Sequence, residues 1–288
     1  MSPTRRDFLA TAAAATAASA LTRPTLAWAS EAQEAQPVFT PIRGAVGYFT
    51  MRGGTIAYLV NADAVAVVDS QFPDQANALI AGLNERSGGR RVDALVNTHH
   101  HGDHTGGNIS FRGVATHVVA HANAAEHMRN PPGAQPPADQ LYPDVTFVDS
   151  WSGDLGDEKV WARHYGRAHT SGDIVVTFEK ANVAHMGDLM FHRRHPVVDR
   201  AAGATLRNWM QVLDRTVADH AKDTAYVFGH AAVGLQPIGT WTDLVRYHDY
   251  IEAVLTWVGA QIRAGRSQDE IMAMREPLAG FEDFGPFG

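Results

Sequence analysis

The sequence contains no cysteine. Disulfide bonds are therefore excluded, and so is any metal site that depends on thiolate ligands. Basic residues are also in the minority, with 24 Lys and Arg against 31 Asp and Glu and a net charge of -7 at pH 7. Because binding to a phosphate backbone needs a basic face, this balance argues against a nucleic-acid partner.

The apolar run near the N-terminus, residues 8–21, is too short for a comfortable membrane span. It follows Arg5 and Arg6, and a small-x-small cleavage pattern comes after it at residues 27–29. This arrangement is typical of a twin-arginine export signal, and an ordinary amphipathic or disordered leader is the alternative. We therefore expect residues 1–29 to be removed during export to the periplasm, leaving no membrane anchor.

The remaining residues, 30–288, are expected to form one domain that begins with a flexible lead-in at residues 30–41. Hydrophobic residues make up 45% of the chain and charged residues 19%, so material for a sizeable core is present. Residues 45–50, 55–60 and 64–69 predict an antiparallel meander, followed by a helix capped by Asp74. Further strands are expected at residues 92–97, 114–119, 145–148, 160–165, 174–178, 183–186 and 225–228, and further helices at residues 121–129, 205–218, 241–263 and 267–275.

A metal-binding pattern follows the strand at residues 92–97. His99 and His101 are two residues apart, so their side chains can leave one face of the backbone and hold one small cation. Asp103 and His104 come directly afterwards, which allows a second ion beside the first. Imidazole nitrogens and a carboxylate suit zinc and neighbouring metals. A histidine-rich surface loop is the alternative interpretation of this segment.

Several strand-like runs end shortly before a residue that can bind metal, namely His99, His169, Asp188 or His230. In α/β folds, sites form where loops converge at the carboxyl ends of strands. The regularity therefore predicts that these side chains meet at one point. Asp69 ends a strand in the same layer and is expected to support a metal-binding histidine indirectly.

Taken together, His99-x-His101-x-Asp103-His104, a His169-Thr-x-Gly-Asp segment, Asp188 and Gly229-His230 resemble the metallo-β-lactamase superfamily over residues 46–230. The resemblance implies an α/β fold, the four-layer αββα sandwich, with two metal ions at one edge. It also implies the ligands: His99, His101 and His169 for the first metal, Asp103, His104 and His230 for the second, and Asp188 between the two.

The resemblance further implies a zinc-dependent hydrolase, with iron or manganese as other metals that this ligand set accepts. A water bound to such a metal loses its proton near neutral pH and attacks an ester, lactone, thioester or β-lactam carbonyl. Asp103 is the expected catalytic residue, because it can orient that water and pass its proton to the leaving group. Many zinc β-lactamases carry a cysteine near the position of Asp188, so the set is more similar to the glyoxalase II and lactonase branches.

The substrate is expected to be a small molecule, and the oligomeric state is left open. Residues 131–143 are rich in proline and predict a long loop that faces the substrate, with Tyr142 as a contact. Arg193 and Arg194 follow Asp188 closely, and either can hold a substrate carboxylate; a solvated basic loop is the alternative.

Other functions are also compatible with parts of the pattern. A mononuclear iron dioxygenase acting on sulfur or persulfide compounds would use a similar fold and some of the same ligands. A non-catalytic binding protein would have no need of a second ion, and the nuclease branch lacks a basic surface. Metal content and oxygen uptake distinguish the iron enzyme from the hydrolase.

Overall fold

The computed structural model describes residues 36–287. The predicted signal peptide, residues 1–29, lies outside the described residues. The predicted flexible lead-in is wrong in its last part, because strand β1 (Val38–Arg43) begins there and pairs antiparallel with β2 (Val46–Thr50). Phe39 explains the difference, since its ring packs 4.9 Å from Phe49 and 5.6 Å from Tyr58, measured between ring centroids.

The first sheet has seven strands, and their order in space is their order in the chain. Strands β2 to β4 form the predicted antiparallel meander, β1 adds a fourth antiparallel strand to it, and the remaining links from β4 to β7 are parallel. Helices make the parallel crossovers, as such links require. After β2 the elements are β3 (Ile56–Val60), β4 (Val65–Val68), α2 (Pro73–Ser87), β5 (Val92–Asn97), α3 (Gly102–Thr105), η1 (Gly106–Phe111), β6 (Ala115–His121), α4 (Ala122–Arg129) and β7 (Val145–Phe147).

The second sheet has six strands in the order β15-β13-β11-β10-β9-β8. A short parallel pair, β12 with β14, lies beside it. The sequence did not predict β8, because its apolar alternation is weak: Gly153 stands between Trp151 and Leu155, the two apolar residues that pack on the core. The elements are β8 (Ser150–Leu155), β9 (Glu158–Arg163), β10 (Val175–Phe178), β11 (Val183–His185), η2 (Gly187–Leu189), β12 (Phe191–His192), α5 (Leu206–Asp219), β13 (Ala225–Val227), β14 (His230–Ala231), β15 (Ile238–Gly239), α6 (Trp241–Arg263) and α7 (Gln268–Ala273).

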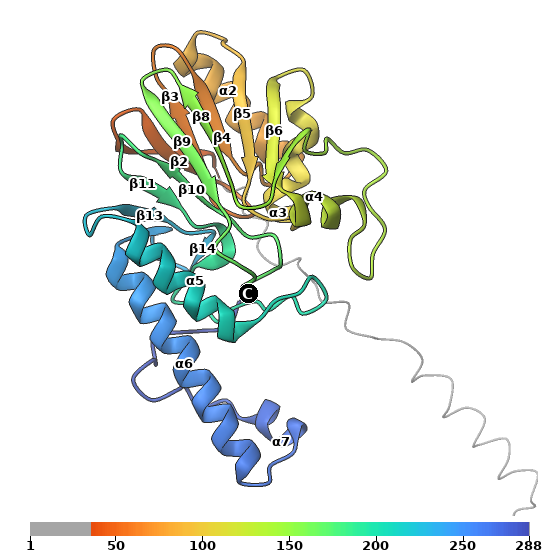
Figure 1. Cartoon of the computed structure of the whole chain (residues 1–288), viewed down its shortest axis with the longest axis vertical. Helices are drawn as coiled ribbons and strands as arrows, with labels where there is room; N and C mark the ends of the chain where they lie inside the picture. The colour runs from red at the N-terminus through yellow and green to blue at the C-terminus, as the bar shows by residue number, and fades with distance from the viewer. Residues whose placement is uncertain (1–35, 288) are drawn as a thin grey trace, which may run out of the picture. The chain divides into compact units, whose positions relative to one another are not determined.

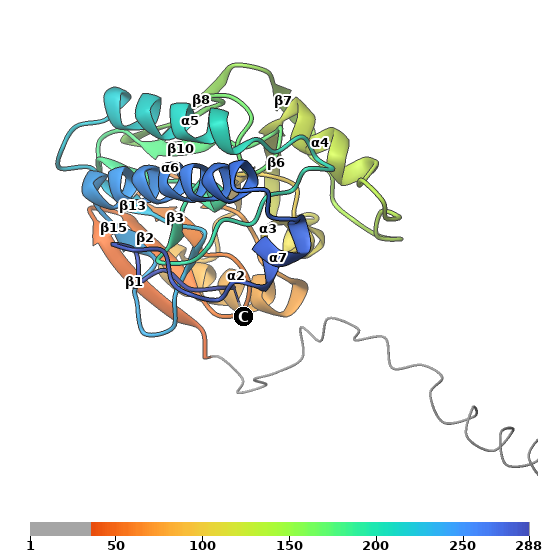
Figure 2. The ribbon, with the colours of Figure 1, turned by 90° about the horizontal axis from the view of Figure 1, so that it is seen from below.

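These elements form four layers, and buried apolar side chains fill the spaces between them (Figures 1 and 2). One buried cluster, which includes Val68 and Val176, fills the space between the two sheets. A second cluster packs α2 against the first sheet through Leu79 and its neighbours. A third packs α5 and α6 against the second sheet and contains the fully buried Trp209. The predicted αββα sandwich is therefore confirmed.

The helix ends follow local chemistry. Asp74 was predicted to cap α2, but the cap is Phe72 and Asp74 lies in the first turn. Pro73 accounts for this shift, because its fixed φ suits the first helical position and its missing N–H would have no partner there. At α7 the cap is Ser267, whose side chain accepts a hydrogen bond from the amide of Glu270.

Residues 131–143 contain no helix or strand, in agreement with their proline content. Within the described range 36–287, none of the helices combines the length and the apolar character that a membrane span requires.

Candidate metal centre

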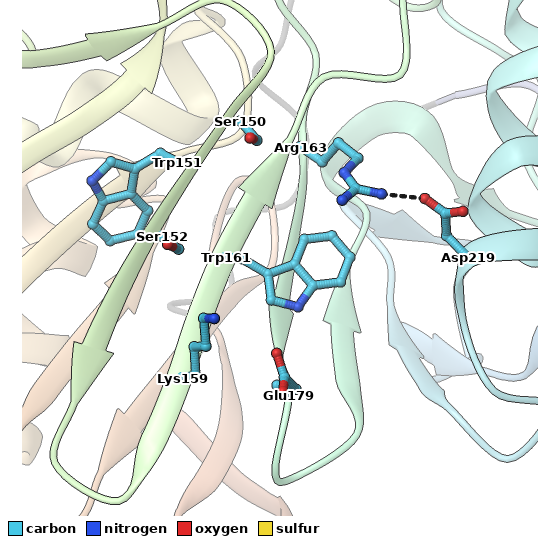
Figure 3. A pocket seen from close by; sticks show the side chains of 8 residues that line it. All are labelled: Ser150, Trp151, Ser152, Lys159, Trp161, Arg163, Glu179 and Asp219. Atoms are coloured by element: carbon cyan, nitrogen blue, oxygen red, sulfur yellow. Dashed lines mark hydrogen bonds and ion pairs between the residues drawn. The ribbon is translucent and has the colours of Figure 1, made fainter.

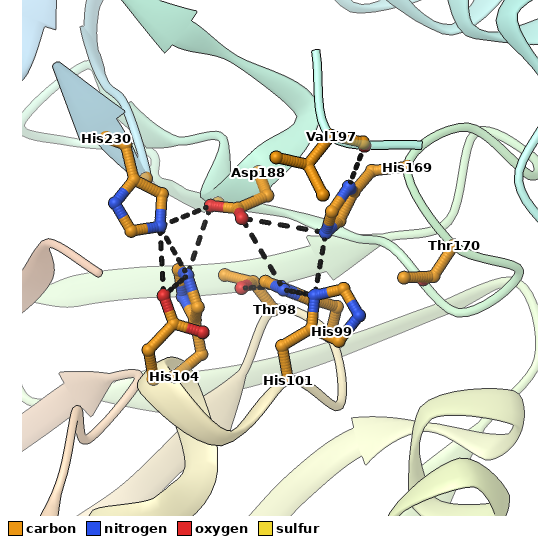
Figure 4. A network of polar contacts seen from close by, with 12 residues as sticks. Thr98, His99, His101, His104, His169, Thr170, Asp188, Val197 and His230 are labelled. Atoms are coloured by element: carbon orange, nitrogen blue, oxygen red, sulfur yellow. Dashed lines mark hydrogen bonds and ion pairs between the residues drawn. The ribbon is translucent and has the colours of Figure 1, made fainter. Parts of the chain in front are cut away.

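The candidate metal-binding side chains meet at one edge of the two sheets (Figure 4). Most of them come from the turns and loops that follow strands: the turn after β5, the loop between β9 and β10, and the η2 turn after β11. One more is the first residue of β14, shortly after β13. The short helix α3 supplies the rest. The residues that the structure brings together are His99, His101, Asp103, His104, His169, Asp188 and His230.

A first group contains three histidines and one oxygen of Asp188. His101 Nδ1 lies 3.1 Å from His99 Nε2 and 2.9 Å from His169 Nε2. The Oδ2 atom of Asp188 is 3.8 Å from His99 Nε2 and 3.5 Å from His169 Nε2. Three nitrogens and one oxygen therefore surround a common point. Four is the number of ligands that zinc prefers.

A second group lies next to the first. His104 Nε2 is 3.3 Å from His230 Nε2, and Asp103 Oδ2 is 3.1 Å from the same nitrogen of His230. The other carboxylate oxygen of Asp188, Oδ1, faces this group at 3.1 Å from His104 Nε2. Asp188 is thus the residue that both groups share, with one oxygen directed to each.

Hydrogen bonds at the far side of each ring decide which nitrogen faces the centre. His169 Nδ1 donates to the carbonyl of Val197 at 2.6 Å, and His101 Nε2 donates to Asp199 Oδ2 at 2.9 Å. His99 Nδ1 lies 3.1 Å from the Thr98 hydroxyl, which donates its own proton elsewhere. The inward nitrogens of these neutral imidazoles therefore carry lone pairs and no proton.

Asp69 lies behind the candidate metal ligands and holds Thr98 and His104 by hydrogen bonds. Its carboxylate accepts hydrogen bonds from the Thr98 amide and hydroxyl, each at 2.7 Å, and from His104 Nδ1 at 2.7 Å. The residue is fully buried and has a left-handed backbone, with φ of 67°. A buried carboxylate behind a metal-binding histidine fixes the orientation of the ring and increases its basicity.

The charges of the centre shift the pKa values of its members. Burial disfavours a charged imidazole, yet the carboxylates of Asp188, Asp103 and Asp69 raise the pKa of His104 well above its ordinary value. Despite the same burial, Asp188 and Asp103 raise the pKa of His230 to about 9. By contrast, burial and the adjacent His104 lower the pKa of His99 well below its ordinary value. The second group therefore favours positive charge, and His99 favours the neutral form that binds metal.

The donor set fits two divalent cations. The inward nitrogens of His99, His101 and His169 are acceptors only about 3 Å apart, an arrangement that is repulsive unless a cation lies between them. Asp188 Oδ1 is buried and, among residues 36–287, has no hydrogen-bond donor in good geometry, although His104 Nε2 lies 3.1 Å away. Such an oxygen is costly without a partner, and a metal ion would satisfy it. Imidazole nitrogens with carboxylate oxygens match zinc, iron or manganese.

A glycine keeps the space behind Asp188 free. A Cβ atom on Gly229 would lie 2.0 Å from Asp188 Oδ1 and 2.7 Å from the carbonyl of Gly187. Glycine at position 229 therefore has a steric explanation. The backbone must pass this close to the shared carboxylate of Asp188 so that His230 can reach the second group.

The predicted substrate contacts lie outside the cluster. Arg193 forms ion pairs with Asp243 at 3.5 Å and Asp283 at 3.2 Å, and Arg194 donates to the carbonyl of Ala231 at 2.8 Å. Tyr142 lies under the guanidinium of Arg129, 5.3 Å from its ring centroid. Both predicted arginines are thus engaged by the protein itself.

The sequence did not point to Asp199 or Val197 as partners of the metal-binding histidines. Both lie between β12 and α5, in residues 193–205. This segment has no periodic pattern that would indicate which of its residues contact the candidate metal centre. Their partners, His101 and His169, were identified, but nothing in the spacing indicated what holds these rings from behind.

A separate hollow of about 520 Å³ opens on the second sheet (Figure 3). It contains none of the candidate metal ligands, and two of its charged residues, Arg163 and Asp219, pair with each other. Trp161 stacks on His220 with ring centroids 5.3 Å apart. The lining residues are Ser150, Trp151, Ser152, Lys159, Trp161, Arg163, Glu179 and Asp219.

Comparisons with known proteins agree with this geometry. The family model described as the metallo-beta-lactamase superfamily matches residues 51–230. A hydroxyacylglutathione hydrolase of Methylococcus capsulatus is 31% identical over 128 residues, which are 44% of this chain and 43% of that protein. The chain thus matches less than half of the length of this relative.

Two solved structures share the fold. A metallo-beta-lactamase from Pontibacter korlensis superimposes with a TM-score of 0.63 at 19% identity, covering 75% of this chain and 99% of that one. The metallo-beta-lactamase IND-7 gives a TM-score of 0.59 at 20% identity, covering 74% and 98%.

Proposed function

Because this chain belongs to the metallo-β-lactamase superfamily, we propose that it is a dinuclear zinc hydrolase that cleaves a carbonyl substrate: an ester, lactone, thioester or β-lactam. The observation that carries the proposal is Asp188, whose two oxygens face two separate groups of nitrogen and oxygen ligands. A protein that only stores one metal ion has no use for this arrangement.

The ligands have distinct roles in the proposed reaction. His99, His101 and His169 would hold the first zinc ion, and Asp103, His104 and His230 the second, with Asp188 in contact with both. When bound, such a pair of ions supplies an activated water and an electrophile for the carbonyl oxygen.

Asp103 is the residue proposed to move protons. Its side chain is 31% exposed, whereas Asp188 is buried, so Asp103 can contact both solvent and substrate. Burial alone would raise the pKa of Asp103, but His104 and His230 lower it to about 2, so the carboxylate is ionised at neutral pH. An ionised Asp103 would accept a hydrogen bond from the attacking water, orient it, take up its proton, and later pass that same proton to the leaving atom.

Within the carbonyl substrates we favour esters, lactones and thioesters over β-lactams. The position that many zinc β-lactamases fill with cysteine is Asp188 here. The curated relative is a hydroxyacylglutathione hydrolase, whose name denotes thioester cleavage, although its match is partial. Both points support the ranking.

The alternative is a mononuclear iron dioxygenase for sulfur or persulfide compounds. It needs only one of the two groups of ligands. The second group is as well formed as the first, with His104 and His230 nitrogens 3.3 Å apart and Asp103 beside them. This observation favours the hydrolase.

We further propose that the protein works in the periplasm after twin-arginine export, on a small-molecule substrate and without a nucleic-acid partner. The support is the Arg5-Arg6 segment with its apolar run, and the net charge of -7. Fractionation of cells carrying Arg5→Lys, Arg6→Lys or both tests the export: the double variant should remain in the cytoplasm.

Hydrolysis of a small panel tests the proposed function. The zinc-loaded protein is assayed with a lactone, a thioester, an aryl ester and nitrocefin, and the iron-loaded protein is given a persulfide substrate while dissolved oxygen is recorded. Turnover of at least one carbonyl substrate without oxygen uptake is expected. Oxygen consumption with the persulfide and no hydrolysis would instead favour the iron dioxygenase.

A further inference from the structure

The segment after α7 returns to the metal centre and pairs with residues 193–195. His195 donates its amide to the carbonyl of Gly285 at 2.8 Å, and Gly285 donates to the carbonyl of Arg193 at 3.2 Å. A parallel bridge between Arg194 and Gly285 accompanies these bonds. The segment thus continues alongside the residues that follow β12, close to the point where Asp188 enters the centre.

Aromatic and ionic contacts fix this segment in place. Phe284 is buried and stacks on Tyr250 of α6, with centroids 4.1 Å apart and planes at 14°. Asp283 accepts from Arg246 at 2.6 Å and pairs with Arg193 at 3.2 Å. Such contacts, in which several charges and a stacked ring act together, hold a segment more firmly than one exposed ion pair.

Phe287 is placed by these contacts against a candidate metal ligand. Its ring centroid is 4.8 Å from that of His230, with planes at 80°, and 5.7 Å from that of Phe191. Phe191 stacks on the same imidazole at 5.6 Å and 6°. Phe287 is only half-buried, so part of this residue is exposed beside the second group of ligands, while the guanidinium of Arg194 lies over its ring, 4.8 Å from the centroid.

The other side of the centre is also apolar at its surface. Val197, whose carbonyl holds His169, is 41% exposed, and its side chain lies beside His169 and Asp188 (Figure 4). The arginines that were expected to receive a substrate carboxylate are engaged: Arg193 by two carboxylates, and Arg194 by two carbonyls and the ring of Phe287.

We propose that Phe287 forms an apolar wall of the substrate site beside the second ion and sets a preference for substrates with an alkyl or aryl acyl group. This inference rests on the proposed function and specifies its substrate class. The acyl group lies against the exposed part of the Phe287 ring while its carbonyl is at the ions. Burying each methylene group against such a surface strengthens binding about fourfold.

Binding of carboxylates, which resemble the product of hydrolysis, tests the wall without turnover. Acetate, butyrate and hexanoate are titrated into the zinc-loaded wild type and into Phe287→Ala, Phe287→Leu and Phe281→Ala, and zinc content is measured in each. Phe281 is the matched control, because it belongs to the same segment but packs on Tyr250, 5.5 Å away. Michaelis constants for acetyl, butyryl and hexanoyl aryl esters are compared in parallel.

The wild type and Phe281→Ala should bind hexanoate at least tenfold more tightly than acetate. Phe287→Ala should lose most of this dependence on chain length, and Phe287→Leu should keep part of it, all with the zinc content of the wild type. The same dependence in Phe287→Ala as in the wild type would overturn the proposal. So would loss of zinc from Phe287→Ala and Phe287→Leu, which would make the ring a support for His230 instead.

The proposed function is judged separately. If the zinc-loaded protein hydrolyses nothing in the panel, yet hexanoate binding depends on Phe287, the wall stands as an apolar ligand site and the hydrolase is contradicted. If hydrolysis occurs without any effect of Phe287 on chain length, the hydrolase stands and the wall is refuted.

Discussion

At the scale of single residues, the hydrogen-bond partners of the candidate metal-binding histidines decide which ring nitrogen faces the centre. His101 turns Nδ1 to the centre because its Nε2–H donates to Asp199, whereas His169 presents Nε2 because its Nδ1–H donates to the carbonyl of Val197. Each partner thus selects one tautomer, so that the nitrogen facing the centre is free to bind a cation.

Asp103→Asn should lower kcat/KM about 10²–10⁴-fold, because an amide cannot accept the proton that the carboxylate moves. The amide keeps one oxygen toward His230, so the fold should remain close to the wild type, and zinc is added in excess because the second ion loses a carboxylate ligand. Steady-state kinetics, zinc analysis and thermal unfolding on one preparation check this. Near-normal turnover in the fully loaded variant would remove Asp103 from the mechanism.

Asp69→Asn should weaken binding of the second zinc ion about 10–100-fold, since His104 loses the carboxylate that orients it. It should also lower the free energy of unfolding by about 2 kcal/mol, because buried hydrogen bonds to a charged acceptor are weakened. Competition with a zinc chelator and urea unfolding provide the two measurements.

Asp93→Asn is the matched control for Asp69→Asn. Asp93 accepts the amide of Val65 at 2.9 Å, at the other end of the same strand pair. Its replacement should leave zinc affinity unchanged. An equal loss of affinity in both variants would show that the effect of Asp69 is not local to the centre.

At the scale of elements, strand ends and turns position the candidate ligands. The backbone at Gly229, which follows β13, passes especially close to the Asp188 carboxylate. Gly229→Ala should displace the Asp188 carboxylate, because its Cβ has only 2.0 Å to Oδ1. We expect substoichiometric zinc and at least a 10²-fold loss of kcat/KM. Gly102→Ala is the control, since a Cβ there meets nothing within 4 Å. Equal activity in the two variants would refute the steric argument.

Helix α4 carries a pH-dependent contribution to stability. His121 caps it by accepting the amide of Asn123 and stacks on His164 with centroids 4.1 Å apart. Burial and the nearby His164 lower the pKa of His121 to about 4, against an ordinary value of 6.5. The unfolded chain therefore binds the proton first, so this contribution is complete above pH 6.5 and is lost as the pH falls toward 4.

His121→Asn keeps a capping side chain but does not titrate. Its free energy of unfolding, measured in urea between pH 4 and 7, should fall less steeply with decreasing pH than that of the wild type. Curves of the same slope would show that His121 does not provide this dependence.

The sequence predicted most elements because their apolar periodicity is strong, as in α6, whose bounds agree with the structure. It missed β8, since Gly153 interrupts the alternation of Trp151 and Leu155 in this short edge strand, and it placed β1 in a flexible lead-in. The ligands were identifiable because they follow strands at short, characteristic spacings. Asp199 and Phe287 were not, because tertiary contacts alone bring those segments to the centre.

At the scale of the whole molecule, the centre connects the two sheets. The first sheet contributes His99 and the α3 residues, and the second contributes Asp188 and the strand that leads to His230. Metal bound at this centre would therefore join the two halves of the sandwich, and a ligand that binds only the folded state stabilises it by mass action. Removal of zinc should lower the unfolding temperature of the whole domain in one transition.

The most direct test of the central claim is a zinc titration of the metal-free protein, with bound metal and hydrolysis of the best panel substrate recorded together. Two zinc ions per chain, with activity that vanishes on chelation and returns with zinc, are the predicted result. A protein that binds one iron ion per chain, gains no hydrolytic activity with zinc and consumes oxygen would contradict the account.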